Sequence, residues 1–189
     1  MKKYELTAEF IEKWGKKLFR IKALISFGSV EAGELGGYVE KEDNLAQNGD
    51  AWVYGDAWVC DDAWVYGNAR VYGNARVYGD AEVYGDARVC GNARVCGNAE
   101  VYGDADYLLI GRIGSRFSFT TFFKNKGKGI TVSCGCFLGT IAEFRAKVTD
   151  THGNNKHAKI YNLAADMAEL QILGEEHIDK LNTNKSEPF

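Results

Sequence analysis

Residues 51–104 decide the fold and read AWVYGD AWVCDD AWVYGN ARVYGN ARVYGD AEVYGD ARVCGN ARVCGN AEVYGD. They are consecutive copies of one six-residue unit. Ala and Val lie two positions apart in every unit, so on an extended strand both point to the same, inward face, while the residue between them and the following Tyr or Cys point outward. Gly followed by Asp or Asn marks a corner, because these residue types tolerate positive φ. Each unit predicts a short strand and a bend.

A strand of so few residues cannot bury its apolar face alone. The units must therefore stack, each strand hydrogen-bonding to the coils above and below it at a spacing of about 4.8 Å. The repeats predict a mainly β protein built on a parallel solenoid. Open solenoid ends expose unpaired strand edges and need caps, and the flanking sequences supply them.

The repeats also resemble known families. The run A-x-V-Y-G-[DN] resembles the hexapeptide-repeat, left-handed β-helix families. Residues 19–59, FRIKALISFGSVEAGELGGYVEKEDNLAQNGDAWVYGDAWV, resemble the N-terminal region of the YdcK-type hexapeptide proteins of bacteria and of phages or prophages, and the likeness covers about the first two thirds of the chain. The resemblance implies a three-sided, left-handed parallel β-helix with eighteen residues per coil and about three regular coils. Members carry a transferase label derived from the fold, which implies little about chemistry.

With eighteen residues per coil, outward side chains eighteen apart form columns, and the three sides differ chemically. The columns are Trp52, Arg70 and Arg88 on the first side, Trp58, Arg76 and Arg94 on the second, and Trp64, Glu82 and Glu100 on the third. The third side also carries a tyrosine ladder of Tyr66, Tyr84 and Tyr102, whereas Cys60, Cys90 and Cys96 replace Tyr at other outward positions and are read as structural thiols.

Two interpretations of these columns stay open. In one, the charges form a solvated face. In the other, an Arg side of one subunit meets the Glu and Tyr side of another, or a small anion relieves the repulsion between stacked arginines. The candidate interface or anion-binding residues are Arg70, Arg76, Arg88, Arg94, Glu82, Glu100, Tyr66, Tyr84 and Tyr102. Hexapeptide proteins are commonly trimers, so the resemblance implies a homo-oligomer, with a trimer favoured and a further protein partner as another candidate.

The chain divides into four predicted parts. They are an N-terminal β cap over 1–45, the left-handed β-helix over 46–113, a small C-terminal α+β module over 114–182 and a disordered tail over 183–189. In the cap, residues 18–27 alternate like a strand and pair with residues 3–7 through a turn near Gly15. We expect the three tryptophans of the first coil to pack against this cap as core residues.

The C-terminal module shows helix signals. Residues 107–113 leave the solenoid, and residues 121–123 and 130–134 predict a hairpin. Thr140 with Glu143 forms a capping box that opens a helix ended by Gly153. A second helix, from about 156 to 173, is expected to end at Gly174. Its apolar stripe is Ile160, Leu163, Met167 and Leu170.

Composition limits the partners and the compartment. A formal net charge of −3 argues against nucleic acid or a membrane as a bulk partner. No apolar segment follows Met1, because lysines and glutamates interrupt it, so we expect a soluble, cytoplasmic protein. The five cysteines indicate free thiols of a reducing compartment.

Histidine placement bears on catalysis. Hexapeptide acyltransferases generally use a histidine base on or near the solenoid. All three histidines here, His152, His157 and His177, lie in the C-terminal module. No residue inside the repeats indicates catalysis, so an acyltransferase would need a rearranged intersubunit site with His152 or His157 as its base. No cofactor is predicted.

One metal site is a weak candidate. Cys134 and Cys136, two apart on a predicted strand, point to one face, and His152 and His157 would complete a four-ligand zinc site. The spacing matches no familiar zinc pattern, so the preferred assignment is no metal and buried thiols.

These observations favour a non-catalytic, oligomeric binding or structural protein of phage or prophage type. The solenoid would be a scaffold that displays the C-terminal interaction module, and countering host defence is a role consistent with that setting. The alternative is a hexapeptide-family acyltransferase with a site between subunits.

Overall fold

The computed structural model describes residues 2–175. The predicted disordered tail over 183–189, and His177, lie outside the described residues. Tertiary contacts divide the chain into two compact units, Met1–Asp104 and Ala105–Phe189. The first unit contains the solenoid and its cap, and the second contains the C-terminal module.

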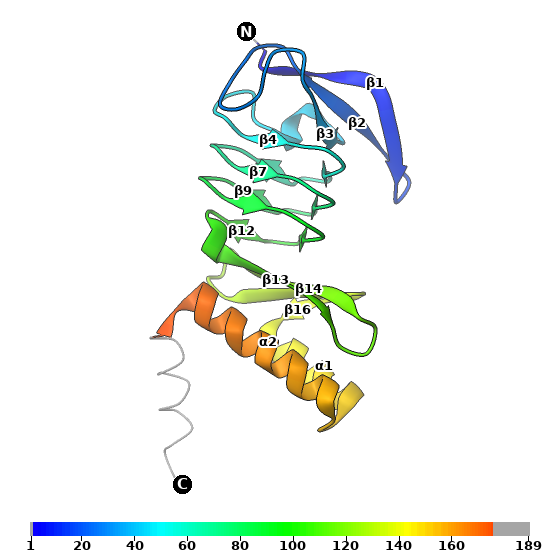
Figure 1. Cartoon of the computed structure of the whole chain (residues 1–189), viewed down its shortest axis with the longest axis vertical. Helices are drawn as coiled ribbons and strands as arrows, with labels where there is room; N and C mark the ends of the chain where they lie inside the picture. The colour runs from blue at the N-terminus through cyan, green and yellow to red at the C-terminus, as the bar shows by residue number, and fades with distance from the viewer. Residues whose placement is uncertain (1, 176–189) are drawn as a thin grey trace. The chain divides into compact units, whose positions relative to one another are not determined.

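The repeats form a three-sided parallel β-solenoid, seen as stacked coils in Figure 1. Each repeat contributes a two-residue strand. Strands of successive coils pair in parallel, so that residues eighteen positions apart are in register, as Trp52 is with Arg70. The eighteen-residue coil is therefore confirmed. The strands are β4 (Trp52–Val53), β7 (Arg70–Val71) and β10 (Arg88–Val89) on face 1; β5 (Trp58–Val59), β8 (Arg76–Val77) and β11 (Arg94–Val95) on face 2; and β6 (Trp64–Val65), β9 (Glu82–Val83) and β12 (Glu100–Val101) on face 3.

The solenoid interior is made of the alanines and valines, all of which are buried. Their small volumes let the three faces approach closely, as the period-two pattern predicts. The corners depend on glycine. Gly79 has φ of +72°, and a Cβ there would lie 2.9 Å from the backbone N of Gly97 in the next coil. Only a residue without a side chain satisfies both conditions.

An irregular first turn precedes the regular coils. Strand β3 (Leu35–Val39) pairs with β5, so that Tyr38 lies beside Trp58, and Leu45 forms a parallel bridge with Val65. A short 3-10 helix, η1 (Glu42–Asn44), lies between these contacts. Together with the three regular coils, this turn makes a solenoid of about four turns.

The predicted N-terminal hairpin is present. Strand β1 (Tyr4–Lys13) pairs antiparallel with β2 (Lys16–Ala23), and β2 pairs with β3, so the hairpin extends the sheet of face 2. Lys3 is buried at the solenoid end and donates to the carbonyl of Ala51 at 2.9 Å. Burial lowers the pKa of Lys3 to about 8, although the negative charge of Asp50 tends to raise it.

The tryptophan prediction holds for two of three residues. Trp52 is fully buried against Tyr4 and Phe27, and Trp58 is buried beneath the hairpin. Trp64, however, is 43% exposed. It lies on face 3, which the hairpin does not reach, and stacks on Tyr66 with ring centroids 3.9 Å apart.

The second unit is an antiparallel sheet with two helices. The strands, in sheet order, are β13 (Tyr107–Ile113), β14 (Ser118–Lys124), β15 (Ile130–Cys134) and β16 (Phe137–Thr140). A short 3-10 helix, η2 (Asp104–Asp106), precedes β13. Because β13 pairs with β14, residues 107–113 belong to this sheet, whereas the sequence division assigned 46–113 to the solenoid.

Both predicted helices form with the expected ends. Helix α1 (Ile141–His152) has the Thr140 and Glu143 capping box, and Gly153 follows its last turn. Helix α2 (Lys156–Leu173) is capped by Asn155, whose side chain accepts from the N–H groups of His157 and Ala158, and it ends at Gly174. No helix within residues 2–175 is long and apolar enough to span a membrane.

The face of α2 that packs inward differs from the prediction. The buried residues are Ala158, Tyr161, Ala164, Ala165 and Ala168. The predicted stripe of Ile160, Leu163, Met167 and Leu170 is exposed. Alanines also recur at helical spacing along this sequence, and their small size lets the helix lie close to the sheet and α1. The larger apolar residues are left on the outside.

Candidate functional site

The outward residues of the solenoid form the predicted columns. Arg88 is in register with Arg70 on face 1, and Glu100 with Glu82 on face 3. Arg94 is in register with Arg76 on face 2. The structure thus places each group of candidate residues on a separate face. Faces 1 and 2 carry basic columns, and face 3 carries an acidic column.

Face 3 is an ordered aromatic and acidic strip. The rings of Tyr66 and Tyr84 stack in parallel with centroids 4.8 Å apart, and Tyr102 meets Tyr84 edge-on at 5.2 Å. Tyr66 donates to Glu82 at 3.2 Å, and Tyr84 donates to Glu100 at 2.8 Å. Burial and the hydrogen bond to Glu82 raise the pKa of Tyr66 to about 12. The phenols therefore stay protonated near neutral pH and fix the two carboxylates in place.

Face 1 presents the opposite charge. Arg70 is half-buried, Arg88 is exposed, and Tyr72 is exposed beside them. Above them in the first coil, the Trp52 position is covered by the N-terminal cap. The accessible part of face 1 is therefore a basic column from the second and third coils.

The hairpin overlies part of face 2. The ring of Trp14, in the hairpin turn, packs edge-on against Trp58 at 4.8 Å and against Tyr78 at 5.1 Å. Beside this contact lies a groove of about 290 Å³. It is lined by Ile11, Lys13, Tyr38, Asp56, Trp58, Asn74 and Arg76.

Arg76 is the most distinctive residue of this groove. Its guanidinium lies over the Trp58 ring, 5.7 Å from the centroid. The side chain makes no hydrogen bond or ion pair with any residue in the described part of the chain. Burial, and then the charge of Arg94, lower the pKa of Arg76 below its ordinary value. A partly desolvated guanidinium of this kind favours an oxygen acceptor from outside the chain.

Two cysteines predicted on the outside are buried. Cys60 lies under the hairpin with Leu18, Tyr38 and Trp58. Cys96 is buried beside Tyr78. Burial raises the pKa of the Cys60 thiol to about 12, so the thiolate is scarce at neutral pH. Both thiols occupy outward positions of the repeat. Cys60 is covered there by the hairpin, whereas Cys96 lies against Tyr78 of the preceding coil.

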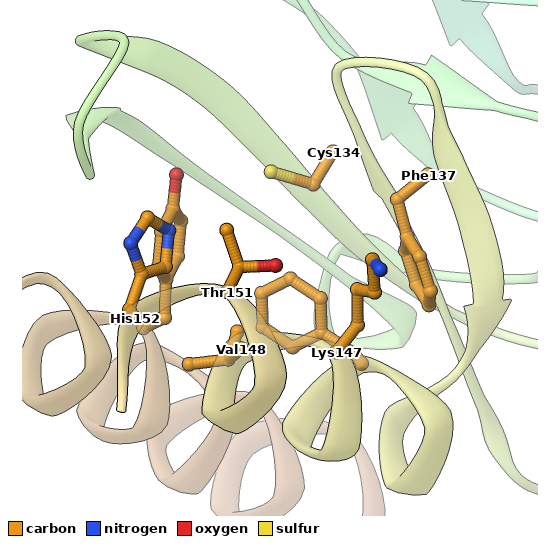
Figure 2. A pocket seen from close by; sticks show the side chains of 8 residues that line it. Cys134, Phe137, Lys147, Val148, Thr151 and His152 are labelled. Atoms are coloured by element: carbon orange, nitrogen blue, oxygen red, sulfur yellow. The ribbon is translucent and has the colours of Figure 1, made fainter. Parts of the chain in front are cut away.

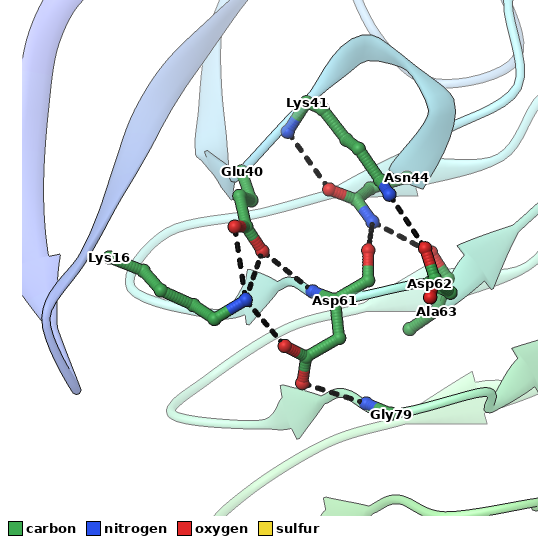
Figure 3. Close-up of polar contacts among 8 residues, drawn as sticks. All are labelled: Lys16, Glu40, Lys41, Asn44, Asp61, Asp62, Ala63 and Gly79. Atoms are coloured by element: carbon green, nitrogen blue, oxygen red, sulfur yellow. Dashed lines mark hydrogen bonds and ion pairs between the residues drawn. The ribbon is translucent and has the colours of Figure 1, made fainter.

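A polar network that the sequence did not reveal joins hairpin, first turn and solenoid (Figure 3). Lys16 contacts Glu40 at 2.9 Å and Asp61 at 2.6 Å. Asp61 also accepts from the N–H of Gly79 at 3.0 Å. The one available signal is the repeat AWVCDD, in which Asp61 stands at the glycine corner position with φ of +60°.

This network also includes residues of the types that bind metal ions. Glu40, Cys60 and Asp61 are the one group of three possible ligands that comes together within the described residues. The ammonium group of Lys16 already lies between the two carboxylates, as Figure 3 shows, and supplies the balancing positive charge. The donor set is therefore that of a structural ion-pair network.

The predicted zinc set is not assembled among the described residues. Cys134 ends β15 and pairs with Phe137, so Cys136 lies in the turn between them and is exposed. Gly135, with φ of +62°, makes that turn possible. The assumption that Cys134 and Cys136 share one strand face is wrong, because the strand ends between them.

Cys134 instead borders a small cavity in the second unit (Figure 2). The cavity, of about 100 Å³, is lined by Cys134, Phe137, Phe144, Lys147, Val148, Thr151, His152 and Tyr161. Cys134 accepts from the hydroxyl of Thr120 at 3.2 Å. Burial and the neighbouring Cys134 raise the pKa of Tyr161 to about 12.

The candidate histidines are held by aromatic contacts. His152 stacks on Tyr161 with centroids 5.7 Å apart and lies 5.8 Å from the ring of His157. The Nδ1 atom of His157 is buried and finds no hydrogen-bond partner among the described residues. These contacts give neither ring an orienting carboxylate, which a general base ordinarily has.

The fold and these surfaces define a class: a β-solenoid protein of six-residue repeats, followed by a small α+β unit. A family profile for the YdcK beta solenoid repeat matches residues 63–79, 69–85 and 75–91. The repeats over residues 63–91 are thus β-solenoid repeats of the YdcK type. Comparison with curated proteins gives no match.

Proposed function

We propose that this chain is a non-catalytic binding or structural protein that assembles with copies of itself through the outer faces of the solenoid. In this proposal the second unit is an interaction module carried by the scaffold. The observation that supports it most is the opposite charge of two accessible faces. Arg70 and Arg88 form a column on face 1, and Glu82 and Glu100 form one on face 3.

The two columns are suited to a contact between different faces of neighbouring subunits. Successive coils stack at one fixed spacing. The arginines in a column on one copy are therefore spaced like the glutamates in a column on another. Arg and carboxylate groups pair with good geometry, and aromatic rings such as Tyr102 are enriched at interfaces. A contact between two different patches closes into a ring when its rotation allows. The family resemblance favours a trimer.

Face 1 supports this contact better than face 2. The hairpin residue Trp14 packs on Trp58 and Tyr78 of face 2, so a flat partner would meet the hairpin before reaching Arg94. On face 1, Arg70 is half-buried and Arg88 is exposed, and the ring contacts of Trp14 are with face 2. We therefore assign the basic half of the contact to Arg70 and Arg88.

Charge reversal tests the assembly. Light scattering coupled to size exclusion should give an oligomer for the native sequence and a species of lower mass for Arg70→Glu with Arg88→Glu. Arg112→Glu with Arg116→Glu makes the same charge change in the second unit and should leave the mass unchanged, since both residues are exposed there. A native chain that is monomeric, or an oligomer whose mass is unchanged by reversal at Arg70 and Arg88, would contradict the proposal.

The groove at Arg76 is where this proposal places a small anion. Arg76 and Lys13 supply positive charge, and Trp58 supplies an aromatic surface. Titration with inorganic phosphate, followed by tryptophan fluorescence, should show saturable binding that Arg76→Gln weakens at least about tenfold. Lys17→Gln, on the same hairpin but outside the groove, is the matched control. Equal responses from both variants would show binding elsewhere.

The biological setting rests on the resemblance to YdcK-type proteins of bacteria and phages. It favours a phage or prophage protein, for which interference with host defence is one use of a binding scaffold. Genes for phage components beside the coding gene would support this setting. Copurification of an acyl-CoA, or turnover of an acceptor, would instead support the hexapeptide acyltransferase alternative.

A further inference from the structure

Helix α2 carries an exposed apolar stripe. Its four residues are Ile160, Leu163, Met167 and Leu170, which are 38%, 63%, 57% and 48% exposed. They follow one another at intervals of three, four and three residues, which is the spacing of a coiled-coil seam. Contiguous exposed apolar residues of this kind mark an interaction surface more often than scattered ones.

The stripe is presented by a helix that is already folded. The opposite side of α2 is buried through Ala165 and Ala168, and Asn155 caps its first turn. Eighteen residues are short for an isolated coiled coil. Because the second unit holds this helix in place, docking a partner costs little ordering of the backbone.

The charges beside the stripe select the partner and its direction. The N-terminal half of α2 has exposed Lys156 and Lys159, and the C-terminal half has exposed Asp166 and, mostly buried beside it, the carboxylate of Glu169. Arg145 contacts both acids at 2.7 Å, which leaves the pair with one net negative charge. A parallel copy would place lysine beside lysine, whereas an antiparallel copy places lysine beside the acidic half.

The stripe is also self-complementary in the antiparallel direction. Its midpoint falls between Leu163 and Met167, so rotation of a second copy about that point sets Ile160 opposite Leu170 and Leu163 opposite Met167. The helix dipoles then oppose each other, which is favourable. We infer that the α2 stripe is a docking surface for α2 of a second copy of this chain, packed antiparallel. This inference does not depend on contacts between solenoid faces.

The test uses the full chain carrying Arg70→Glu and Arg88→Glu, so that any solenoid contact is removed. Sedimentation over a range of concentrations should show a reversible monomer–dimer equilibrium. Adding Leu163→Gln and Met167→Gln should leave a monomer with unchanged helical circular dichroism. Phe117→Gln with Leu138→Gln, two exposed apolar residues elsewhere in the second unit, should leave the dimer intact.

Orientation is tested by cross-linking in a Cys136→Ser background. A mixture of Leu163→Cys and Met167→Cys chains should form the mixed disulfide faster than either like pair. A monomer at all concentrations, or a dimer that survives the glutamine pair, would overturn the inference. So would a monomer whose melting temperature falls with the glutamine pair, because the stripe would then be covered within its own chain. Preferential 163–163 disulfides would overturn the antiparallel arrangement.

Discussion

Gly79 and Gly97 occupy the same corner of the solenoid one coil apart, with φ of +72° and +63°. A Cβ at Gly79 would meet the backbone of Gly97, whereas a Cβ at Gly97 has nothing within 4 Å. We expect Gly97→Ala to lower the free energy of unfolding by about 1–2 kcal/mol, the cost of left-handed backbone for alanine. Gly79→Ala should cost about 1 kcal/mol more, because its neighbour must move.

Denaturation followed by tryptophan fluorescence measures this difference, since Trp14, Trp52, Trp58 and Trp64 all lie in the first unit. Equal losses for the two variants would show that the coils do not stack as closely as described.

Lys16 gives a second prediction at the residue scale. Burial tends to raise the pKa of the Asp61 carboxyl, but hydrogen bonds from Lys16 and from the N–H of Gly79 outweigh it and hold this pKa below its ordinary value. Such a group stabilises the fold above its unfolded pKa of about 4, and the contribution is lost as pH falls through the folded value. Lys16→Met should therefore lower the melting temperature at pH 7.

The pH dependence separates this effect from a loss of packing. The difference between native chain and Lys16→Met should shrink as pH falls below about 4, where Asp61 takes up a proton. Lys17→Met, which removes only a contact over the Phe10 ring, is the control. A deficit that is the same at pH 3 and pH 7 would count against the ion-pair account.

Single residues could be assigned from sequence where the repeat alone decides their surroundings. The inward Ala and Val positions follow from the period of two. Trp64 and Cys60 could not be assigned in this way, because their exposure depends on which face the hairpin covers. The Lys16 contact joins residues far apart in sequence and leaves only the irregular AWVCDD repeat as a signal.

At the scale of elements, the buried face of α2 is open to a direct test. Ala168 is fully buried and faces the core, so Ala168→Leu should lower the free energy of unfolding of the second unit by about 1–3 kcal/mol through overpacking. Ala146→Leu, at an exposed position of α1, should change it by less than about 0.5 kcal/mol. Helical circular dichroism follows this unit, since α1 and α2 are its helices. A larger loss for Ala146→Leu would mean that the helices pack through other faces.

Element ends were easier to predict than element faces. The capping box at Thr140 and the glycines 153 and 174 are local signals, and both helices end where these residues indicate. The packing side of α2 depends on the distance to the sheet, which favours alanines over the larger Ile160, Leu163 and Met167. When one helix has two apolar stripes, sequence periodicity does not show which of them packs against the core.

At the scale of the molecule, the eighteen-residue coil converts a linear repeat into three chemically distinct faces. The columns themselves could be predicted, because stacking follows from the family resemblance and the repeat length. Their accessibility could not, since the cap and hairpin come from segments outside the repeat. The central claim that faces 1 and 3 join copies of the chain therefore rests on the whole solenoid and not on any one residue.

The most direct test of that claim is native mass spectrometry of two charge-reversed chains, measured alone and mixed. Arg70→Glu with Arg88→Glu makes face 1 acidic, and Glu82→Arg with Glu100→Arg makes face 3 basic. In the mixture, the acidic face 1 of one chain can meet the basic face 3 of the other. The account predicts that neither variant forms the native oligomer alone and that mixed assemblies appear on combination. Assemblies that form equally well in the separate samples, or a mixture without mixed species, would contradict it.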